Sequence, residues 1–307
     1  MMDNSHVYDM IIVGGGPGGY TAALYAARAG LDVMLIERLS AGGQMNLTGQ
    51  IDNYPGFPEG VDGFQLSMNM QQQAERFGAK TKYAEVLKLE LEGELKSVQT
   101  NEGIYKAKTV VISTGANPRQ LGVERENEMI GRGVGYCAHC DGMFYRGKSV
   151  VVVGGGNSAV AEALYLSRIA KEVILVHRRD TLRATQIYHK PLQEASNIRF
   201  VWNSEVVELL GEDVLSGVKV KNLRNGEVEQ LDVQGLFVSI GRKPATDLVK
   251  EQLTLDDAGY IMAGEKTETN LPGVYAVGDV RVKELRQIVT AVADGAMAAH
   301  MAEQYLA

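Results

Sequence analysis

Two cysteines carry the most reactive side chains of this sequence, and only two residues separate them. Cys137 and Cys140 are the only cysteines among 307 residues, and Asp141 directly follows the second. On a turn or at a helix start, such a pair can form a small reducible disulfide, and a helix N-terminus or a nearby cation makes the thiolate a nucleophile. The adjoining carboxyl can supply or accept the proton of a leaving thiolate. The motif predicts dithiol–disulfide redox chemistry.

Three other interpretations of the cysteine pair are open. A structural zinc site needs four ligands, usually two such pairs, and the sequence has no second pair. A structural disulfide would stabilise little, because it closes a very small loop and is typical of secreted proteins. Two buried cysteines could also pack as plain hydrophobic side chains. In a reducing compartment a lone pair indicates catalysis or regulation, so we expect redox chemistry and no metal.

Length and composition describe a globular protein large enough for two domains. Hydrophobic residues make up 45% of the chain and charged residues 22%, with a net charge of -7. This negative charge argues against binding to nucleic acid or an anionic membrane. No apolar run reaches the ~20 residues of a membrane helix. Residues 1–6 lack the basic and apolar regions of a signal peptide, which predicts a cytoplasmic protein.

A glycine-rich turn follows the first strand-like run, residues 8–13. The glycines with G-x-G-x-x-G spacing are Gly14, Gly16 and Gly19. A helix is expected over 20–28 and a second strand over 32–36, ending at Glu37. Glu37 lies about 20 residues beyond the first glycine, where a carboxylate binds the ribose of a dinucleotide. Strand, turn, helix and acid together predict a dinucleotide-binding βαβ unit.

The same pattern returns in the second half of the chain. A strand is expected over 149–153, a helix over 160–169 and a further strand over 172–176. The corresponding small residues of the turn are Gly154, Gly156 and Ala159. The chain therefore contains two related dinucleotide-binding units.

The two units differ at the end of their second strands. Where the first has Glu37, the second has His177, followed by Arg178, Arg179 and, a few residues later, Arg183. This exchange removes the partner of a ribose 2′-hydroxyl and supplies cations for a 2′-phosphate. A solvated run of charges is the alternative. We interpret the second unit as preferring NADPH over NADH.

The remaining strand-like runs place the second unit inside the first. These runs are 82–86, 109–112, 217–220, 235–241 and 273–279. An Ala-rich helix is expected over 287–305. We predict an α/β fold with two Rossmann-like, three-layer ββα dinucleotide-binding domains. Residues 1–114 and 243–307 are expected to form one domain, and residues 115–242 the domain inserted into it.

The order of these motifs resembles that of low-molecular-weight bacterial thioredoxin reductases, which are class II pyridine nucleotide-disulfide oxidoreductases. The resemblance covers essentially the whole chain. Further matching segments are Gly42-Gly43-Gln44, Asn53-Tyr54-Pro55-Gly56, Cys137-x-x-Cys140-Asp141-Gly142, His177-Arg178-Arg179, Gly278-Asp279-Val280 and Arg286-Gln287.

The resemblance implies FAD in the first domain and NADPH in the inserted one. The FAD residues it implies are Gly14, Gly16, Pro17, Gly19, Glu37, Gly42, Gly43, Gln44, Asn53, Thr114, Gly278, Asp279, Arg286 and Gln287. The NADPH residues it implies are Gly154, Gly156, Asn157, Ser158, Ala159, His177, Arg178, Arg179, Arg183 and Arg242. From the residues alone, Asp279 is equally consistent with a turn after a strand, and Gln287 with a helix cap.

The resemblance also implies the reaction. NADPH would pass a hydride to FAD, which would reduce the Cys137–Cys140 disulfide. Cys140 would face the flavin, Cys137 would attack the disulfide of thioredoxin, and Asp141 would act as acid and base. Relatives rotate the inserted domain between two states, which places a hinge near residues 115 and 241. A homodimer is also implied.

Residues around the cysteines carry smaller questions. His139 is not the commonest residue between the thiols; its imidazole could tune the pKa of Cys137 or simply face water. Tyr136, Phe144 and Tyr145 are expected to pack rather than to contact a partner.

Rival functions differ in motifs that can be checked. Related enzymes that oxidise small dithiols with oxygen remain an alternative. Relatives that reduce peroxiredoxins carry an extra N-terminal domain. We do not expect that domain here, because the first strand begins at Tyr8. Ferredoxin–NADP reductases of this class lack the thiol pair, and ferredoxin-fed relatives lack the second glycine motif. A non-enzymatic redox sensor or binding module is the third alternative, which the arginines and both glycine motifs disfavour, since a pure binding module needs neither a hydride path nor a dithiol.

Overall fold

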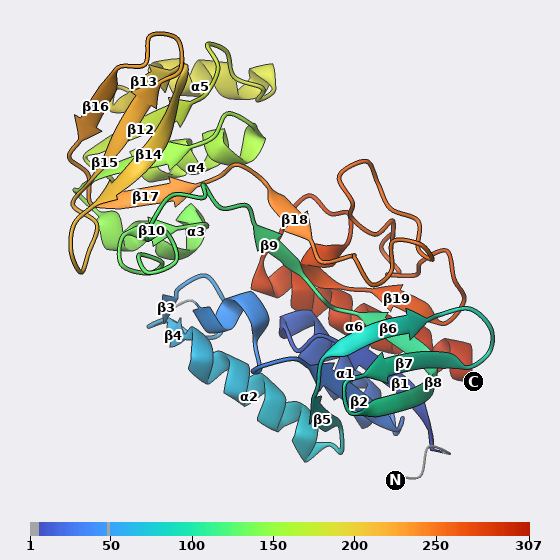
Figure 1. Ribbon diagram of the computed structural model, residues 1–307. Helices are drawn as coiled ribbons and strands as arrows, with labels where there is room; N and C mark the ends of the chain where they lie inside the picture. The colour runs from blue at the N-terminus through green and yellow to red at the C-terminus, as the bar shows by residue number, and fades with distance from the viewer. Residues whose placement is uncertain (1–5, 48–49) are drawn as a thin grey trace. The chain divides into compact units, whose positions relative to one another are not determined.

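The computed structural model describes residues 6–47 and 50–307 (Figure 1). The chain divides into two compact units. Unit 1 consists of Met1–Asn117 and Lys243–Ala307, and unit 2 of Pro118–Arg242. The blue start and the red end of the chain therefore lie in the same unit (Figure 1).

The chain crosses between the units twice, and the crossing segments pair with each other. Strand β9 (Ala116–Pro118) and strand β18 (Arg242–Pro244) form a two-stranded sheet. These crossings lie beside the domain boundaries expected after residues 114 and 242. The assignment of one cofactor to each unit remains a prediction.

Unit 1 is built on a seven-stranded sheet with the order β5-β2-β1-β8-β7-β6, in which β19 also pairs with β8. The strands are β1 (Val7–Val13), β2 (Val33–Glu37), β5 (Lys80–Tyr83), β6 (Val86–Glu90), β7 (Lys96–Thr100), β8 (Gly103–Ile112) and β19 (Val274–Ala276). Strands β2 and β8 each run parallel to β1, and β19 runs parallel to β8. The carboxyl ends of these four strands therefore share one edge of the sheet. Ligands bind outside this edge in α/β sheets.

Alternating apolar residues of β1 bury both faces of this sheet. Met10 and Ile12 pack toward one core, and Ile11 and Val13 toward another. The helices of unit 1 are α1 (Pro17–Arg28), α2 (Gly63–Arg76) and α6 (Ile288–Leu306). Short elements complete it: the 3-10 turns η1 (Gly43–Leu47) and η4 (Gly278–Val280) and the strands β3 (Gln50–Ile51) and β4 (Val61–Asp62).

Unit 2 repeats the layered plan. A parallel sheet has the order β10-β17-β11-β12-β13, and a separate antiparallel sheet has the order β14-β15-β16. The parallel strands are β10 (Val134–Gly135), β11 (Ser149–Val153), β12 (Glu172–His177), β13 (Ile198–Trp202) and β17 (Gly235–Val238). The antiparallel strands are β14 (Ser204–Leu210), β15 (Gly217–Asn222) and β16 (Val228–Leu231). The helical elements are α3 (Ala138–Asp141), η2 (Gly142–Tyr145), α4 (Asn157–Ser167), η3 (Gln186–Tyr188) and α5 (His189–Glu194).

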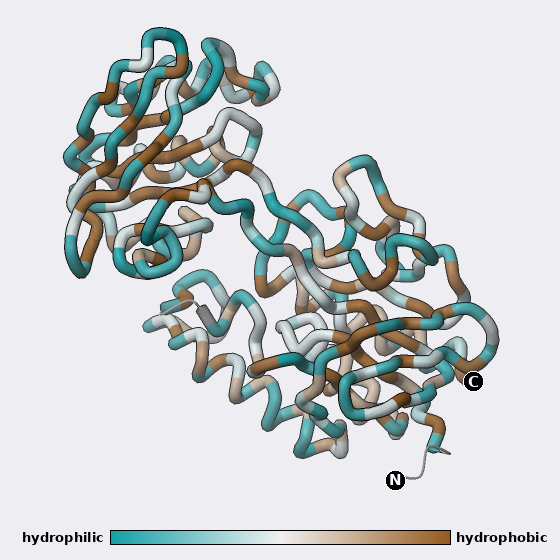
Figure 2. Tube along the Cα trace, in the orientation of Figure 1, coloured by the Kyte–Doolittle hydropathy of each residue, from teal (hydrophilic) through white to brown (hydrophobic). Residues whose placement is uncertain are grey.

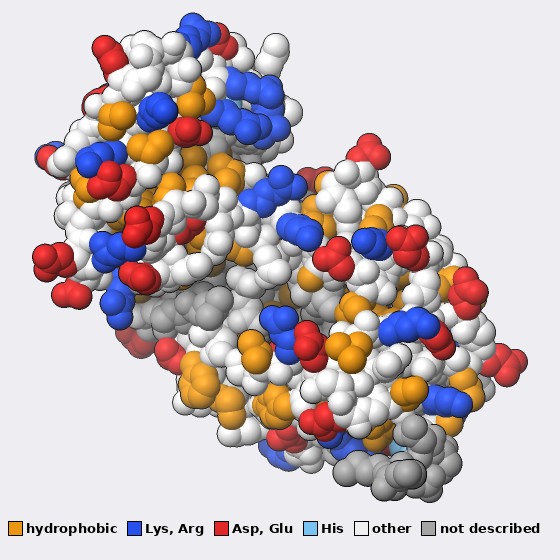
Figure 3. All heavy atoms as spheres, viewed as in Figure 1, with side chains coloured by type: hydrophobic (Ala, Val, Ile, Leu, Met, Phe, Trp, Pro, Cys, Tyr) orange, Lys and Arg blue, Asp and Glu red, His pale blue; other side chains and the backbone are white. Residues whose placement is uncertain are grey.

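The apolar strands explain why unit 2 has three layers. Val151 and Val153 of β11 face a core shared with the antiparallel sheet, whereas Val150 and Val152 face the helices. Figure 2 shows hydrophobic residues along these strands, and Figure 3 shows charged side chains spread over the visible surface. Helices, parallel sheet and antiparallel sheet form the predicted ββα arrangement. No helix in the described ranges is long and apolar enough to cross a membrane.

Several element boundaries differ from those expected. The expected strand 82–86 is wrong: β5 ends at Tyr83 and β6 begins at Val86, because the intervening Glu85 N–H bonds to Asn101 Oδ1 at 2.9 Å. Helices α1 and α4 begin at Pro17 and Asn157, three residues before the expected starts, because each glycine turn leads directly into its helix.

Candidate functional site

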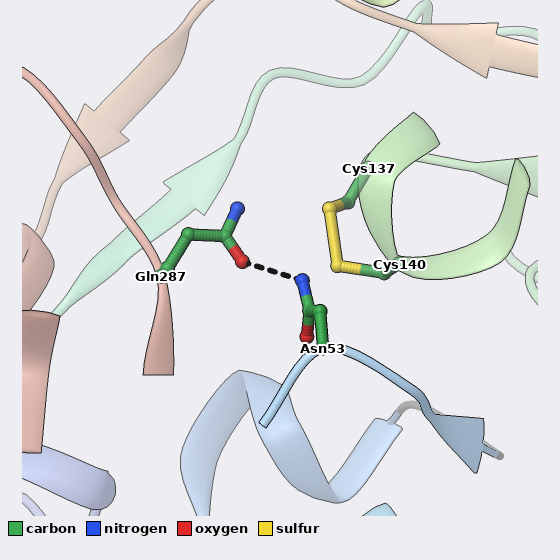
Figure 4. Close-up of a disulfide and its surroundings, with 4 residues drawn as sticks. All are labelled: Asn53, Cys137, Cys140 and Gln287. Carbon is green, nitrogen blue, oxygen red and sulfur yellow. Dashed lines mark hydrogen bonds between the residues drawn. A yellow bond between two sulfur atoms is a disulfide. The ribbon is translucent and has the colours of Figure 1, made fainter. Parts of the chain in front are cut away.

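The two cysteines are joined at the start of a short helix, as the spacing predicts. Cys137 is the N-cap residue of α3 and Cys140 lies within it, with their Cα atoms 5.3 Å apart across the disulfide (Figure 4). The backbone N–H groups of Cys140 and Asp141 each donate to the Cys137 carbonyl at 3.1 Å. Both cysteines are partly exposed, so the disulfide can be reached from solvent.

A buried carboxylate holds the segment that leads into the disulfide. Glu126 is 3% exposed and accepts hydrogen bonds from the N–H groups of Leu121 and Gly122 at 2.9 and 2.8 Å. It also accepts one from the Tyr136 hydroxyl at 2.7 Å, and Tyr136 directly precedes Cys137. Tyr136 is therefore a packing and anchoring residue. The side chain of His139 lies outside the described part of the chain.

The aromatic residues after the disulfide divide into one core and one surface residue. Tyr145 packs edge-on against Phe237, with ring centroids 5.2 Å apart. Phe144 is 51% exposed and its neighbour Met143 41%. The expectation of packing is therefore wrong for Phe144, because its turn is anchored by the aromatic residue after it.

Two carboxyl groups near the disulfide have raised pKa values. Burial raises the pKa of Asp141 to about 6. Burial also raises the pKa of Glu162, on α4, to about 7, against the lowering effects of the Ala138 N–H, the Ser239 hydroxyl and Arg242. The negative charge of Asp141 raises it further. Both groups can therefore exchange protons near neutral pH.

Glu162 is a residue that the sequence did not single out. Its Oε2 atom is buried and has no hydrogen-bond partner among the described residues. The one signal available in the sequence is that Glu162 is the only charged residue of the α4 stretch 157–167. A single charge on an otherwise apolar helix is rarely buried without a role.

The first glycine turn has the shape of a dinucleotide loop. A Cβ on Gly14, which has φ +104°, would lie 2.4 Å from the Ser113 carbonyl oxygen, and one on Gly19 would lie 2.1 Å from the Gly14 oxygen. A Cβ on Gly16, the N-cap residue of α1, would meet nothing within 4 Å. Gly14 and Gly19 therefore permit close packing, and Gly16 leaves open space at a helix N-terminus, which suits a phosphate.

The second glycine turn repeats this arrangement. A Cβ on Gly154, with φ +149°, would lie 2.3 Å from the Ser239 oxygen and 2.6 Å from the Ala159 Cβ. Gly156, the N-cap residue of α4, again has nothing within 4 Å. The residues present therefore fit a second pyrophosphate. The adjoining Asn157 and Ser158 are exposed.

The residues after the second strands differ as predicted from the sequence. Glu37 accepts a hydrogen bond from the Gly15 N–H at 2.7 Å, so its carboxylate braces the first glycine turn. In unit 2 the His177 ring occupies the corresponding space, since a Cβ on Gly155 would lie 2.3 Å from it. Burial lowers the pKa of His177, and its Nε2 atom has no partner in the described chain.

Three exposed arginines follow His177. Arg178, Arg179 and Arg183 form no ion pair within the described residues. The Arg183 N–H donates to the Gly155 carbonyl at 2.7 Å, which brings this segment back to the glycine turn. Cations gathered beside a nucleotide loop suit an additional phosphate.

Other predicted flavin residues of unit 1 are linked by hydrogen bonds. The amide of Gln44 donates to Asn117 at 3.1 Å, and that of Asn53 to Gln287 at 3.0 Å (Figure 4). Gln287 is also the N-cap residue of α6, in a capping box with Thr290. The cap interpretation of Gln287 is therefore confirmed, and its role in binding the flavin remains a prediction.

The C-terminal segment of unit 1 contains further predicted flavin residues. Arg286 stacks on Tyr260, with its guanidinium carbon 4.1 Å from the ring centroid. The Arg286 Nε atom is buried and lacks a partner in the described chain, which fits a bound group with acceptor atoms. Asp279 lies in η4, directly after β19. The Thr114 hydroxyl donates at 2.7 Å to the Ala245 carbonyl, directly after β18.

Comparisons with known proteins agree with this geometry. Residues 8–295 match the family model "Pyridine nucleotide-disulphide oxidoreductase". A thioredoxin reductase from Streptomyces clavuligerus is 46% identical, covering 99% of this chain and 95% of the relative. The crystal structure of thioredoxin reductase from Streptococcus pyogenes is 45% identical, with a TM-score of 0.91 and 99% coverage of both chains. Thioredoxin reductase from Giardia duodenalis is 34% identical, with a TM-score of 0.91 and coverage of 98% and 99%.

These similarities extend over nearly the whole chain, and the range matched by the family model spans both glycine turns and both cysteines. The resemblance noted in the sequence is thereby confirmed. Proteins of this kind use a flavin and a nicotinamide dinucleotide. With two nucleotide loops and one reducible disulfide in a single chain, this protein belongs to the thioredoxin reductase family of pyridine nucleotide-disulphide oxidoreductases.

Proposed function

We propose that this protein is an NADPH-dependent flavoprotein that reduces the disulfide of thioredoxin. The observation that carries the proposal is the Cys137–Cys140 disulfide at a helix start, in the same unit as a dinucleotide loop with free arginines. The names of its relatives support thioredoxin as the substrate. The lone cysteine pair supports a reducing cytoplasm as its location.

In this proposal unit 1 holds FAD. The open space over Gly16 would accept the pyrophosphate, and Glu37 the ribose. The other residues that would hold it are Gly14, Pro17, Gly19, Gly42, Gly43, Gln44, Asn53, Thr114, Gly278, Asp279, Arg286 and Gln287. When bound, the flavin carries two electrons from the nicotinamide to the disulfide.

Unit 2 would hold NADPH. The space over Gly156 would accept its pyrophosphate, flanked by Gly154, Asn157, Ser158 and Ala159. Its 2′-phosphate would meet the cations beside His177, which are Arg178, Arg179 and Arg183. Arg242 would flank the nucleotide from β18. The exposed and unpaired arginines support NADPH over NADH, since a free ribose gives them no partner.

The chain's own groups would carry out the exchange with the substrate. Two electrons and two protons convert the disulfide to two thiols. Cys137 then attacks the disulfide of the substrate, forming a mixed disulfide and releasing one substrate thiolate, which Asp141 protonates. Cys140 next attacks the Cys137 sulfur, which restores the disulfide and releases the reduced substrate. The raised pKa of Asp141 keeps part of this carboxyl protonated near neutral pH.

Two further features follow from the proposal. The exposed Met143 and Phe144 beside the disulfide would form part of the surface that a protein substrate contacts. The paired crossings β9 and β18 are the only covalent connections of unit 2, so the proposed rotation would take place there. A homodimer also belongs to this proposal.

Anaerobic titration tests the proposal directly. We expect the purified protein to contain a flavin that NADPH bleaches at far lower concentration than NADH, and that oxidised thioredoxin restores. The Cys137→Ser variant is the matched control, in which bleaching persists and restoration stops. Equal responses to both nucleotides would contradict the phosphate assignment alone. Bleaching without restoration in the unaltered protein would contradict thioredoxin as the substrate.

A further inference from the structure

A buried ionic cluster lies on α6, outside the residues that the motifs identify. The Asp294 carboxylate accepts hydrogen bonds from Arg281, at 2.6 Å from Nη2 and 2.9 Å from Nε, and from Lys283 Nζ at 2.7 Å. The three side chains are only 8%, 12% and 7% exposed, in that order. Burial by itself raises the pKa of Asp294, but the two cations outweigh it and hold this pKa below its ordinary value. The carboxylate is therefore ionised and tightly held.

The same carboxylate fixes the turn after β19. Its Oδ2 atom accepts the Gly278 N–H at 2.9 Å. Gly278 has φ +72° and opens the turn η4 that presents Asp279. Four donors thus converge on Asp294: one backbone amide at the turn and three N–H groups of two side chains just beyond it. The carboxylate thus holds the backbone one residue before Asp279.

The same face of α6 also touches the first turn of α1. Residues three and four positions apart share a helix face, which places Ala291, Asp294 and Gly295 together. A Cβ on Gly295 would lie 2.2 Å from the Gly18 carbonyl oxygen, so the two helices are in direct backbone contact there. A Cβ on Gly18 would lie 3.1 Å from the Ala291 oxygen. This face therefore joins the glycine turn to the Gly278 turn.

Stability alone does not require such a cluster. Well-packed apolar residues replace buried ion pairs with equal or better stability, whereas removing one partner leaves uncompensated buried charge. What the charges add here is geometry, because four hydrogen bonds to one carboxylate tie the Gly278 N–H to the side chains of Arg281 and Lys283. Burial lowers the pKa of Lys283, and the hydrogen bond and charge of Asp294 oppose this shift.

We propose that Asp294 is a positioning residue for FAD, which sets the distance between the glycine turn and Asp279 and so determines how tightly the cofactor is held. This inference rests on the proposed function, in which unit 1 holds FAD. Asp294 does not touch the reacting atoms; it acts through Gly278 and Asp279.

The test measures FAD binding by full-length protein stripped of cofactor, using the quenching of FAD fluorescence. We expect Asp294→Asn to weaken FAD binding by about tenfold to a hundredfold, because the two cations lose their counter-charge and the amide keeps only one acceptor oxygen for the four donors. At saturating FAD, the KM for NADPH should stay within about twofold of the unaltered value, since unit 2 is unchanged. Glu303→Gln, an exposed change on the same helix, is the control and should bind FAD normally.

A second variant separates positioning from stability. Asp294→Leu combined with Arg281→Met and Lys283→Met removes the whole cluster and leaves no buried charge. We expect this triple variant to unfold at about the temperature of the unaltered protein and still to bind FAD weakly. Normal FAD affinity in either variant would overturn the inference. Unaltered protein that binds no FAD would overturn the assignment of unit 1, and the inference with it.

Discussion

The two glycine turns share their backbone contacts and differ in their side chains. In unit 1 the Gly14 N–H donates to Ile36 at 2.9 Å, and in unit 2 the Gly154 N–H donates to Val176 at 3.0 Å. The segment after the second strand returns to the turn in both units, through a 2.7 Å hydrogen bond from Gly42 in one and from Arg183 in the other. The backbone therefore repeats one solution to holding a pyrophosphate.

The side chains at the corresponding position differ between the two units. Glu37 uses its carboxylate to brace its glycine turn, whereas the His177 ring packs against its turn and leaves three arginines exposed beside it. Unit 2 alone also carries the reducible disulfide. The backbone of the glycine turn is thus common to both units, and in our proposal the choice of nucleotide and the thiol chemistry depend on a few residues outside it.

The largest expected effect comes from removing the chemistry that only unit 2 has. Cys137→Ser should lower thioredoxin-dependent oxidation of NADPH by about a thousandfold or more, because serine cannot replace a thiolate nucleophile. Bleaching of the flavin by NADPH should persist, since both glycine turns are intact. Stopped-flow absorbance measures both steps. Turnover above a tenth of normal would contradict the assignment of Cys137.

The open spaces over Gly16 and Gly156 are expected to accept two different cofactors. Gly16 and Gly156 have φ of -76° and -92°, which any residue can adopt, so valine should be tolerated in the fold. We expect Gly16→Val to weaken FAD binding, and Gly156→Val to raise the KM for NADPH, each by about a hundredfold.

Each valine variant is the control for the other. Gly156→Val should keep its FAD, and the free energy of unfolding of the cofactor-free proteins should change by less than about 1 kcal/mol. The comparison fails if Gly156→Val loses FAD or keeps a normal KM for NADPH.

A smaller effect should distinguish the two nucleotides at unit 2. Arg178→Ala combined with Arg179→Ala should raise the KM for NADPH by about ten- to a hundredfold, because charge-assisted hydrogen bonds to the 2′-phosphate are lost. The KM for NADH should change by less than about twofold, and added salt should narrow the difference between the nucleotides. Arg224→Ala, which removes the partner of Asp180, is the control. Equal loss for both nucleotides would refute the phosphate interpretation.

The raised pKa of Asp141 gives a prediction for stability and pH. In the folded disulfide form this pKa is about 6, against an ordinary value of 3.8, so ionisation opposes folding. The loss of folding stability caused by this ionisation is absent well below pH 3.8 and complete well above about pH 6. At pH 8 we therefore expect the free energy of unfolding of Asp141→Asn to be about 1–2 kcal/mol higher than that of the unaltered protein, allowing for partial exposure.

Urea unfolding at pH 3.5 and pH 8 measures this difference. The gain should vanish at the lower pH, where the unaltered carboxyl is protonated in both states. Asp213→Asn, an exposed change in the same unit, should show no such dependence. A gain that is equal at both pH values would show that ionisation of Asp141 is not its cause.

The smallest effect concerns the exposed aromatic residue of unit 2. Phe144→Ala should raise the KM for thioredoxin by about three- to tenfold with little change in kcat, because it removes apolar contact area and no reacting group. Leu223→Ala, also exposed in unit 2, should leave this KM unchanged. A lower kcat with a normal KM would place Phe144 in the chemistry instead.

The repeated glycine motifs predicted the fold class, and their order together with the cysteine pair and the Gly278-Asp279 segment predicted the family. Strand β11 has the expected bounds, and the cysteine pair lies at a helix start as its spacing predicts. These features depend on residues that are neighbours in the sequence, so the sequence alone is enough to predict them. The specific cofactors and the roles of the individual binding residues remain predictions.

What the sequence could not show depends on distant partners. The break at Glu85 follows from a hydrogen bond to Asn101, and the carboxyl of Glu162 meets groups from α3 and from the end of β17. Asp294 had no local signal, because Arg281 and Lys283 lie 13 and 11 residues earlier, in the segment that precedes α6. Phe144 could not be assigned to core or surface, since that depends on which aromatic residue meets Phe237.

The order in which the chain is synthesised gives the paired crossings a further consequence. All of unit 2 leaves the ribosome before β19 and α6, yet these last segments pack on β8 and α1, which were made first. Unit 2 can therefore fold during translation, while unit 1 waits with one sheet position open. Because the Ala245 N–H bonds to the Gly115 carbonyl at 3.0 Å, the ends of unit 1 meet and the insertion adds little closure entropy. We expect the flavin site to be the last part of the molecule to assemble, after the C-terminal helix is released.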